Sequence, residues 1–404
     1  MKKTFIALAT LAAAGASAAA NVSLYGAADL ALVYQNTKYT AEADSPEIFR
    51  SVRQSSLGLE SGNFNPSKFG LKGQEDLGNG WAVRFKLENG FNADTGTLKS
   101  SGRIFDREAS LTLLGPIGEI SVGRMGALSS TAGTYDIFGA RADAFDGGWG
   151  IFGGGYWNET DRYNNMLTYA TPEVSGARLY AQYSFNTDDQ EVPGARNNNR
   201  YWGVGATYDR GPLSLVAVID SIRRQNDPNV DHDAIDSYTL SLGGNVDFGG
   251  VRAFLGAQFG RHASAMASNS RTRFFSDASI AASEDTTEFM NSVQPFNLKA
   301  HVLHAGLSAD LPVGTLTGAL FYGKTHGPVE RPEDSSGAKY SIKSKYAGAT
   351  AVYSLPLSKR TTLYTGLQLS EYQGTWTISR NLRTGHRRIK TTEFVAGLGL
   401  SHTF

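Results

Sequence analysis

Hydrophobic and polar residues alternate with a period of two along most of this chain. In the stretch 392–404, Phe394, Ala396, Leu398 and Leu400 fall on one face and the residues between them on the other. This is the period of a β-strand and not of a helix. Similar alternating runs begin at Val22, Trp81, Ala177, Val251 and Leu303. The pattern predicts an all-β protein whose strands are apolar on one face only.

Two kinds of break separate these runs. Short breaks rich in Pro and Gly lie at 76–80, 115–118, 171–176, 209–212, 247–250, 311–314 and 355–359. Longer polar stretches lie between them, at 36–65, 92–102, 126–161, 187–199, 225–235, 262–296, 326–340 and 374–388. A secreted β-sandwich could explain each run singly, but it would not explain why short and long breaks alternate. Short turns at one end and long loops at the other are typical of an outer-membrane barrel.

The number of breaks predicts the number of strands. Seven short hairpins give fourteen strands, and the first and last runs bring the total to sixteen. An even number allows the first and last strands to pair, which leaves the sheet without an edge. Sixteen strands enclose an aqueous channel, whereas eight would be filled by their own side chains. Aromatic residues near the strand ends are candidates for interfacial girdles: Tyr34, Phe91, Tyr208, Phe248 and Tyr372.

The first twenty residues have the composition of an export signal. Lys2 and Lys3 precede an apolar stretch at 5–16, and alanines at 18–20 form a cleavage site. We therefore expect residues 1–20 to be a signal peptide and 21–404 to be the barrel domain. No later stretch reaches eighteen consecutive apolar residues, which excludes helical membrane spans.

The charge balance and the absence of cysteine narrow the class further. Basic and acidic residues are equally numerous, 38 of each, so nothing here favours binding to nucleic acid. An exported chain without cysteine has no disulfides to stabilise it. Closure of a large sheet is an alternative source of stability.

The sequence resembles the Gram-negative general porins, which are trimeric barrels of sixteen strands. The resemblance covers nearly all of 21–404 and is carried by the segments 22–26, 69–80, 122–124, 162–169 and 399–404. It implies a homotrimer in the outer membrane, among lipids, that passes small hydrophilic solutes and ions by passive diffusion. The second long break, 92–102, would contact a neighbouring protomer. The third, about 126–161, would fold inward and narrow the pore.

The resemblance also implies a constriction at which acidic residues of the inward loop face basic residues of the wall. The candidate acids are Asp136, Asp143 and Asp146. The candidate bases are Lys68, Arg107 and Arg162, together with Arg84 from its face and Arg124 from its place before the loop. Such opposed charges set up a transverse field that orients dipolar solutes. Phe138, Phe145 and Trp149 could anchor the loop.

Two of these bases do not follow the alternation of their strands. Arg107 is in step with the apolar positions Leu111 and Leu113, and Arg124 is in step with Val122. Each therefore needs a β-bulge or a position at a strand end in order to face water. In the loop, 144–150 reads Ala-Phe-Asp-Gly-Gly-Trp-Gly, where many family members have Pro-Glu-Phe-Gly-Gly, so the assignment of Asp146 rests on an altered motif.

Other chemistry finds little support, and we expect no cofactor and no metal. His301 and His304 are three residues apart and fall on opposite faces of a strand. The acidic stretch 227–233 lacks the Gly and Glu of a calcium loop. The basic residues Arg380, Arg383, His386, Arg387, Arg388 and Lys390 could contact lipopolysaccharide phosphates.

Two alternatives to a general pore remain. A barrel enzyme that hydrolyses lipids would use a Ser/His pair, but the chain has no G-x-S-x-G motif, and we expect no enzymatic activity. A porin selective for a sugar or an anion would show conductance that saturates and that its solute blocks. A general pore would conduct roughly in proportion to the salt concentration.

Overall fold

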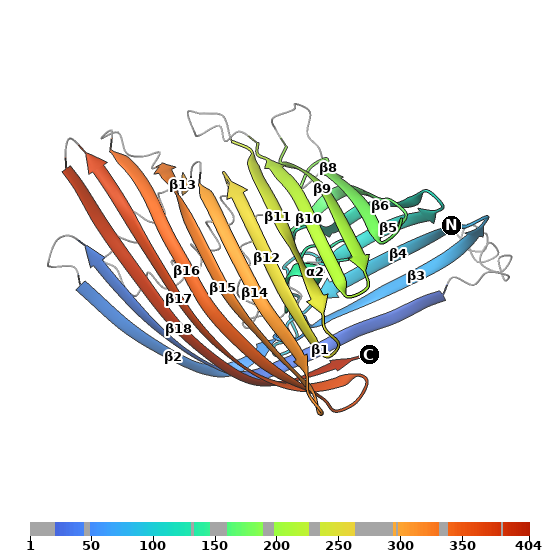
Figure 1. The fold of residues 1–404 in the computed structure, drawn as a ribbon, viewed down its shortest axis with the longest axis horizontal. Helices are drawn as coiled ribbons and strands as arrows, with labels where there is room; N and C mark the ends of the chain where they lie inside the picture. The colour runs from blue at the N-terminus through green and yellow to red at the C-terminus, as the bar shows by residue number, and fades with distance from the viewer. Residues whose placement is uncertain are drawn as a thin grey trace, which may run out of the picture.

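The computed structural model describes residues 21–43, 49–130, 133–145, 160–188, 198–225, 235–262, 294–295, 298–330, 338–380 and 383–404. Within these ranges it is a sheet of antiparallel strands with one short helix, α2 (Gly139–Ala142) (Figure 1). No helix in the described part is long and apolar enough to cross a membrane.

The strands follow one another around the sheet in chain order. The first nine are β1 (Asn21–Ala43), β2 (Phe49–Ser61), β3 (Lys68–Gly78), β4 (Trp81–Gly90), β5 (Glu108–Gly115), β6 (Gly118–Gly126), β7 (Arg162–Ala170), β8 (Ala177–Ser184) and β9 (Arg200–Arg210). The others are β10 (Leu213–Arg223), β11 (Ser237–Asp247), β12 (Val251–Arg261), β13 (Gln294–Pro295), β14 (Lys299–Asp310), β15 (Thr315–Glu330), β16 (Lys339–Pro356), β17 (Thr361–Arg380) and β18 (Arg383–Thr403).

The sheet closes on itself as a barrel of sixteen strands, as predicted. β2 and β3 are consecutive and both pair with β1, so together they occupy one place in the wall. Among the described residues, β13 is a two-residue segment that pairs with the end of β15 alone. β1 pairs with β18 from Ala27 opposite Thr403 to Ala43 opposite Arg387, which joins the first strand to the last.

All seven short breaks are turns between paired neighbouring strands, whereas three of the predicted long loops contain extensions of the strands. The stretches 36–65, 326–340 and 374–388 contain the extensions of β1 with β2, β15 with β16 and β17 with β18. In these extensions the side chains alternate between inside and outside as regularly as they do within the membrane. Because the outward residues are polar here, the sequence of these extensions resembles that of loops. β1 has 23 residues and β18 has 21, whereas a membrane-spanning strand needs about 9–11. The wall formed by β14–β18, β1 and β2 is therefore tall (Figure 1).

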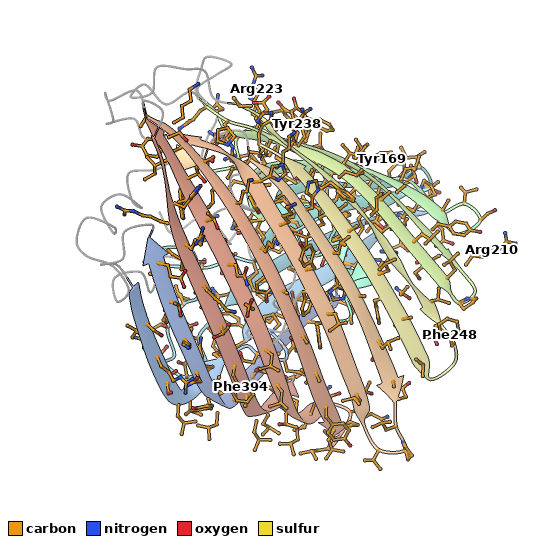
Figure 2. All side chains as sticks on the ribbon, turned by 60° about the vertical axis from the view of Figure 1, so that its left-hand side comes forward. Tyr169, Arg210, Arg223, Tyr238, Phe248 and Phe394 are labelled. Atoms are coloured by element: carbon orange, nitrogen blue, oxygen red, sulfur yellow. The ribbon has the colours of Figure 1, made fainter. Side chains whose placement is uncertain are left out.

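The alternating faces lie as the sequence predicts. Outward side chains are apolar and exposed, as with Leu24 (65%) and Leu320 (64%), because lipid and not protein is their natural surrounding. Tyr238 and Phe248 lie towards opposite ends of the strands (Figure 2), consistent with two aromatic girdles. The prediction was wrong for Tyr372, whose parity turns it to the inside, where it is only 4% exposed.

Candidate functional site: the constriction of the barrel

A carboxylate on the inner face of β4 gathers three of the wall's basic side chains. Glu88 Oε1 accepts a hydrogen bond from Arg107 Nε at 2.6 Å. Glu88 Oε2 lies 3.9 Å from Lys68 Nζ and 3.8 Å from Lys86 Nζ, and it accepts a hydrogen bond from the Tyr25 hydroxyl at 2.9 Å. The Glu88 side chain is 4% exposed, so this charge is held behind the cations that surround it.

A second buried carboxylate ties the inward loop to the same wall. Glu108, at the start of β5, accepts a hydrogen bond from Lys86 Nζ at 2.8 Å. It also accepts bonds from the Thr134 hydroxyl at 2.7 Å and the Thr134 backbone amide at 3.2 Å. Since Thr134 belongs to the loop after β6, Glu108 fixes the point at which that loop leaves the wall.

The irregular backbone that Arg107 and Arg124 required is present. Arg107 lies one residue before β5, and its backbone amide bonds to the carbonyl of Glu88 at 3.2 Å. The pairing of β6 with β7 shifts register between Gly123 and Met125, which places Arg124 at a bulge. Gly123 has φ +127°, and a methyl group there would collide with the carbonyl of Ala109, so only glycine fits.

Arg124 and Arg162 lie side by side at the upper end of this wall. Arg124 Nη1 donates to Asn164 Oδ1 at 2.8 Å, and its Nε donates to the carbonyl of Asp106 at 2.8 Å. The Arg162 side chain is 19% exposed, with its nearest carboxylate, that of Asp161, at 3.8 Å. Arg103 also donates to Asn164 Oδ1, at 2.9 Å, so two guanidinium groups share one amide oxygen.

A separate charged group lies further along β4 and β6. Arg84 pairs with Glu119 at 3.1 Å, and Arg178 pairs with the same carboxylate at 2.8 Å. Tyr135 of the loop donates to Glu119 at 3.3 Å and also contacts the Ser121 hydroxyl. Burial raises the pKa of Tyr135, which keeps this hydroxyl protonated. Arg84 thus belongs to a cluster of its own, apart from the Glu88 group.

The loop crosses from this wall to the opposite one, where three glycines make room for it. α2 packs against β10, β11 and β12. A methyl group at any of the three inward glycines would come within 2.5–2.7 Å of a loop side chain. The pairs are Gly205 with Ile137, Gly243 with Ala142, and Gly306 with Ala144. The sequence therefore allows close contact between loop and wall along β9, β11 and β14.

The far end of the loop is fastened by polar and aromatic contacts. His304 of β14 accepts a hydrogen bond from the Ala144 amide at 3.2 Å, and Asp143 Oδ1 lies 3.5 Å from the same ring nitrogen. Both side chains are fully buried. Phe145 packs against Phe321 with ring centroids 6.4 Å apart. His304 faces inward and His301 outward, as the spacing predicts.

The predicted acids of the loop therefore occupy different places. Asp136 is half-buried and accepts a bond from the Gly139 amide at 2.7 Å, just before α2. Asp143 is 2% exposed. Asp146 and Trp149 lie outside the described residues. A pore role for these acids stays a prediction, as it does for the five bases of the wall.

Sequence reasoning missed the carboxylates of the wall itself, Glu88, Glu108 and Glu119, and with them Lys86. The signal was present, because Arg84, Lys86 and Glu88 alternate along one face of β4. Of these three residues, only Arg84 was predicted to belong to the constriction. Among the residues that the structure describes, no group of three or more His, Cys, Asp or Glu side chains could hold a metal ion.

A closed β-barrel with an apolar outer face, a charged inner wall and a loop folded across the inside defines an outer-membrane channel. The family model described as "Gram-negative porin" matches residues 5–375, and the chain belongs to that family. It is a channel of the outer membrane for passive diffusion.

Individual relatives agree with this assignment. The chain is 32% identical over 269 residues to an outer membrane porin protein of Bordetella pertussis, covering 63% of this chain and 68% of that one. It is 32% identical over 253 residues to outer membrane porin protein 32 of Delftia acidovorans, covering 62% and 67%. The fold is similar to that of an anion-selective porin from Comamonas acidovorans, with a TM-score of 0.58 and 21% identity over 95% of this chain and all of that one.

Proposed function

We propose that the channel is a general-diffusion pore for small hydrophilic solutes and ions, and that its constriction prefers anions. The observation that carries this is a difference in burial between the two signs of charge. The carboxylates Glu88 and Glu108 are 4% and 2% exposed, whereas Lys68 and Lys86 beside them are 26% and 23% exposed. At this point of the wall the cations are therefore more exposed than the two carboxylates that they surround, and such a surface raises the local concentration of anions.

In this proposal the basic wall consists of two parts. Lys68, Lys86, Arg107, Arg124 and Arg162 surround the point where the loop leaves the wall, and Arg84 with Arg178 lies further along. The Ala144 amide anchors the loop on His304, and the buried Asp143 carboxylate accepts a hydrogen bond from the Phe145 amide at 2.9 Å and does not reach the lumen. Asp136 holds the start of α2.

The test is the reversal potential of single channels in planar bilayers separating unequal concentrations of potassium chloride. An anion preference gives a potential of the sign set by chloride. A potential of the opposite sign, or none, would contradict the proposal. Conductance that saturates with salt, or is blocked by one sugar, would favour a selective porin. Ester hydrolysis abolished by a single Ser or His substitution would favour an enzyme.

We further propose that the channel is a homotrimer. Among the described residues β2 pairs only with β1, so one edge of β2 is open. Part of this edge lies in the apolar band, because Leu57 and Leu59 are opposite Tyr34 and Leu32. Open strand edges are not found facing lipid, since their backbone groups would lack hydrogen-bond partners. A neighbouring copy of the chain would cover this part of the wall.

The second outer loop has suitable residues beside this edge. Its hairpin, closed by the bridge between Phe91 and Leu98, exposes Leu98 (45%) and is followed by Ile104 (60%). The Ala93 backbone amide donates a hydrogen bond to the side-chain hydroxyl of Ser61, at the end of β2, at 2.9 Å. The number of copies is checked by the mass of the protein in detergent micelles after correction for bound detergent. A monomer would contradict the proposal.

A further inference from the structure

Basic side chains form a compact patch on the outside of the barrel, where the extended strands rise beyond the apolar band. The patch occupies neighbouring outward positions on β12, β14, β15 and β16. Its members are Arg261, Lys299, His301, Lys324, His326, Lys343 and Lys345, and we call them the outer basic patch. All are exposed except His326, which is half-buried.

The register places these charges directly opposite one another. Lys324 is opposite Lys345, and His326 is opposite Lys343. On the other side of β15, Lys324 is opposite His301 and His326 is opposite Lys299. Directly opposed residues of a sheet have Cβ atoms about 4.5–5.5 Å apart, and like charges at such positions are destabilising. The arrangement therefore calls for a compensating anion.

No described carboxylate forms an ion pair with the patch, although Glu371 on β17 is diagonal to Lys345 and Glu330 lies two outward positions beyond His326 on β15. Within the described residues, no carboxylate occupies the outward positions of β14, β15 or β16 from the patch to the ends of the apolar runs. Lys390 on β18 offers a contrast, because it lies 2.7 Å from Glu371 on the neighbouring strand. The basic segment that the sequence singled out at 380–390 is thus partly neutralised by the wall, whereas the outer basic patch is not.

The patch lies at a defined depth. Two residues towards the membrane along each strand, the outward positions are apolar: Leu303 after His301, Tyr322 before Lys324 and Ala347 after Lys345. The patch therefore begins one step beyond the aromatic and aliphatic band, at the level of lipid head groups. It lies at the end of the strands with the long breaks, opposite to the short turns.

We infer that the outer basic patch binds the phosphate groups of an anionic glycolipid in the outer leaflet. Lysine and arginine at this depth form charge-assisted hydrogen bonds with phosphate oxygens, and several opposed lysines fit a head group with more than one phosphate. The inference uses one feature of the proposed channel, namely the orientation in the membrane that places the long loops outside the cell. It requires nothing of the constriction.

The test compares two variants that lose the same charge at opposite ends of the barrel. K324Q/K345Q removes the central pair of the patch, and K359Q/R360Q removes two exposed charges from a short turn. Each protein is placed in phosphatidylcholine nanodiscs and titrated with a diphosphorylated glucosamine lipid. The same lipid without phosphates and inorganic phosphate are titrated in parallel.

Wild-type protein should bind the phosphorylated lipid, and K324Q/K345Q should weaken this binding about tenfold or more. K359Q/R360Q should bind as the wild type does. Equal binding by all three proteins, or equally tight binding of the dephosphorylated lipid, would overturn the inference. Inorganic phosphate that competes at equal concentration would identify a site for free anions instead. Reversal potentials of the same proteins report on the channel separately, so failure of the proposed anion preference would not be confused with failure of lipid binding.

Discussion

Gly306 of β14 lies directly beneath Ala144 of the inward loop: a methyl group on Gly306 would come within 2.6 Å of the Ala144 Cβ. The Ala144 amide donates to His304, two residues earlier on the same strand, at 3.2 Å. The hydrogen bond holds the loop against the wall, and the absence of a side chain at Gly306 allows the loop to lie this close to β14. Width at the constriction therefore depends on a residue that has no side chain.

Replacing Gly306 by valine should push the loop away from β14 and destabilise the barrel by about 1–3 kcal/mol, as overpacking typically does. The measurement is the midpoint of urea unfolding in detergent, together with single-channel conductance. Gly318→Val is the matched control, because a methyl group at Gly318 meets only the Thr350 carbonyl oxygen, at 3.6 Å. Equal effects of the two substitutions would show that the loop contact is not the cause.

Removing Arg107 and Arg162 together should shift the ion preference towards cations. Glutamine at both positions takes away two fixed positive charges, and the permeability ratio of chloride to potassium should fall about twofold or more. R210Q/K359Q removes two charges from the short turns, one of them labelled in Figure 2, and should leave the ratio unchanged. An unchanged reversal potential for R107Q/R162Q would mean that these arginines do not face the ion path.

The period of two was sufficient to predict the barrel, the seven turns and the orientation of residues such as Leu24 and His304. It could not predict how far each strand continues, because an outward polar residue beyond the membrane, such as Lys38 or Thr375, reads as loop although its backbone is paired. The period reports which face a residue occupies. It does not report whether that face meets lipid or water.

The site was less predictable than the fold for a different reason. Family resemblance and parity selected the bases of the wall, and the bulge at Arg124 followed from its parity. The register between neighbouring strands decides which side chains form ion pairs. The alternation within one strand therefore could not predict that Lys68, Lys86 and Arg107 converge on Glu88. The burial of Asp143 depends on the path of a loop whose sequence has no periodicity to indicate it.

Glu108→Gln should separate the two roles of the buried carboxylate. The amide keeps the size of the side chain but removes the charge that pairs with Lys86 at 2.8 Å. Anion preference should increase, and stability should fall by about 1–3 kcal/mol because Lys86 and Thr134 lose a charged acceptor. Reversal potential and urea unfolding report these effects. Glu75→Gln, at an exposed position of β3, is the control. A fall in anion preference for Glu108→Gln would contradict the assignment of charge at the constriction.

The open edge of β2 makes a prediction about assembly. Leu57 and Leu179 are both outward and similarly exposed, at 66% and 58%, but Leu57 lies on β2 and Leu179 on β8, away from that edge. Leu57→Gln should weaken association because it places a polar group in the proposed contact, whereas Leu179→Gln should change only the face towards lipid. Gel migration of unboiled samples over a temperature series gives the dissociation temperature. We expect it to fall for Leu57→Gln alone, and an equal fall for both would place the subunit contact elsewhere on the barrel.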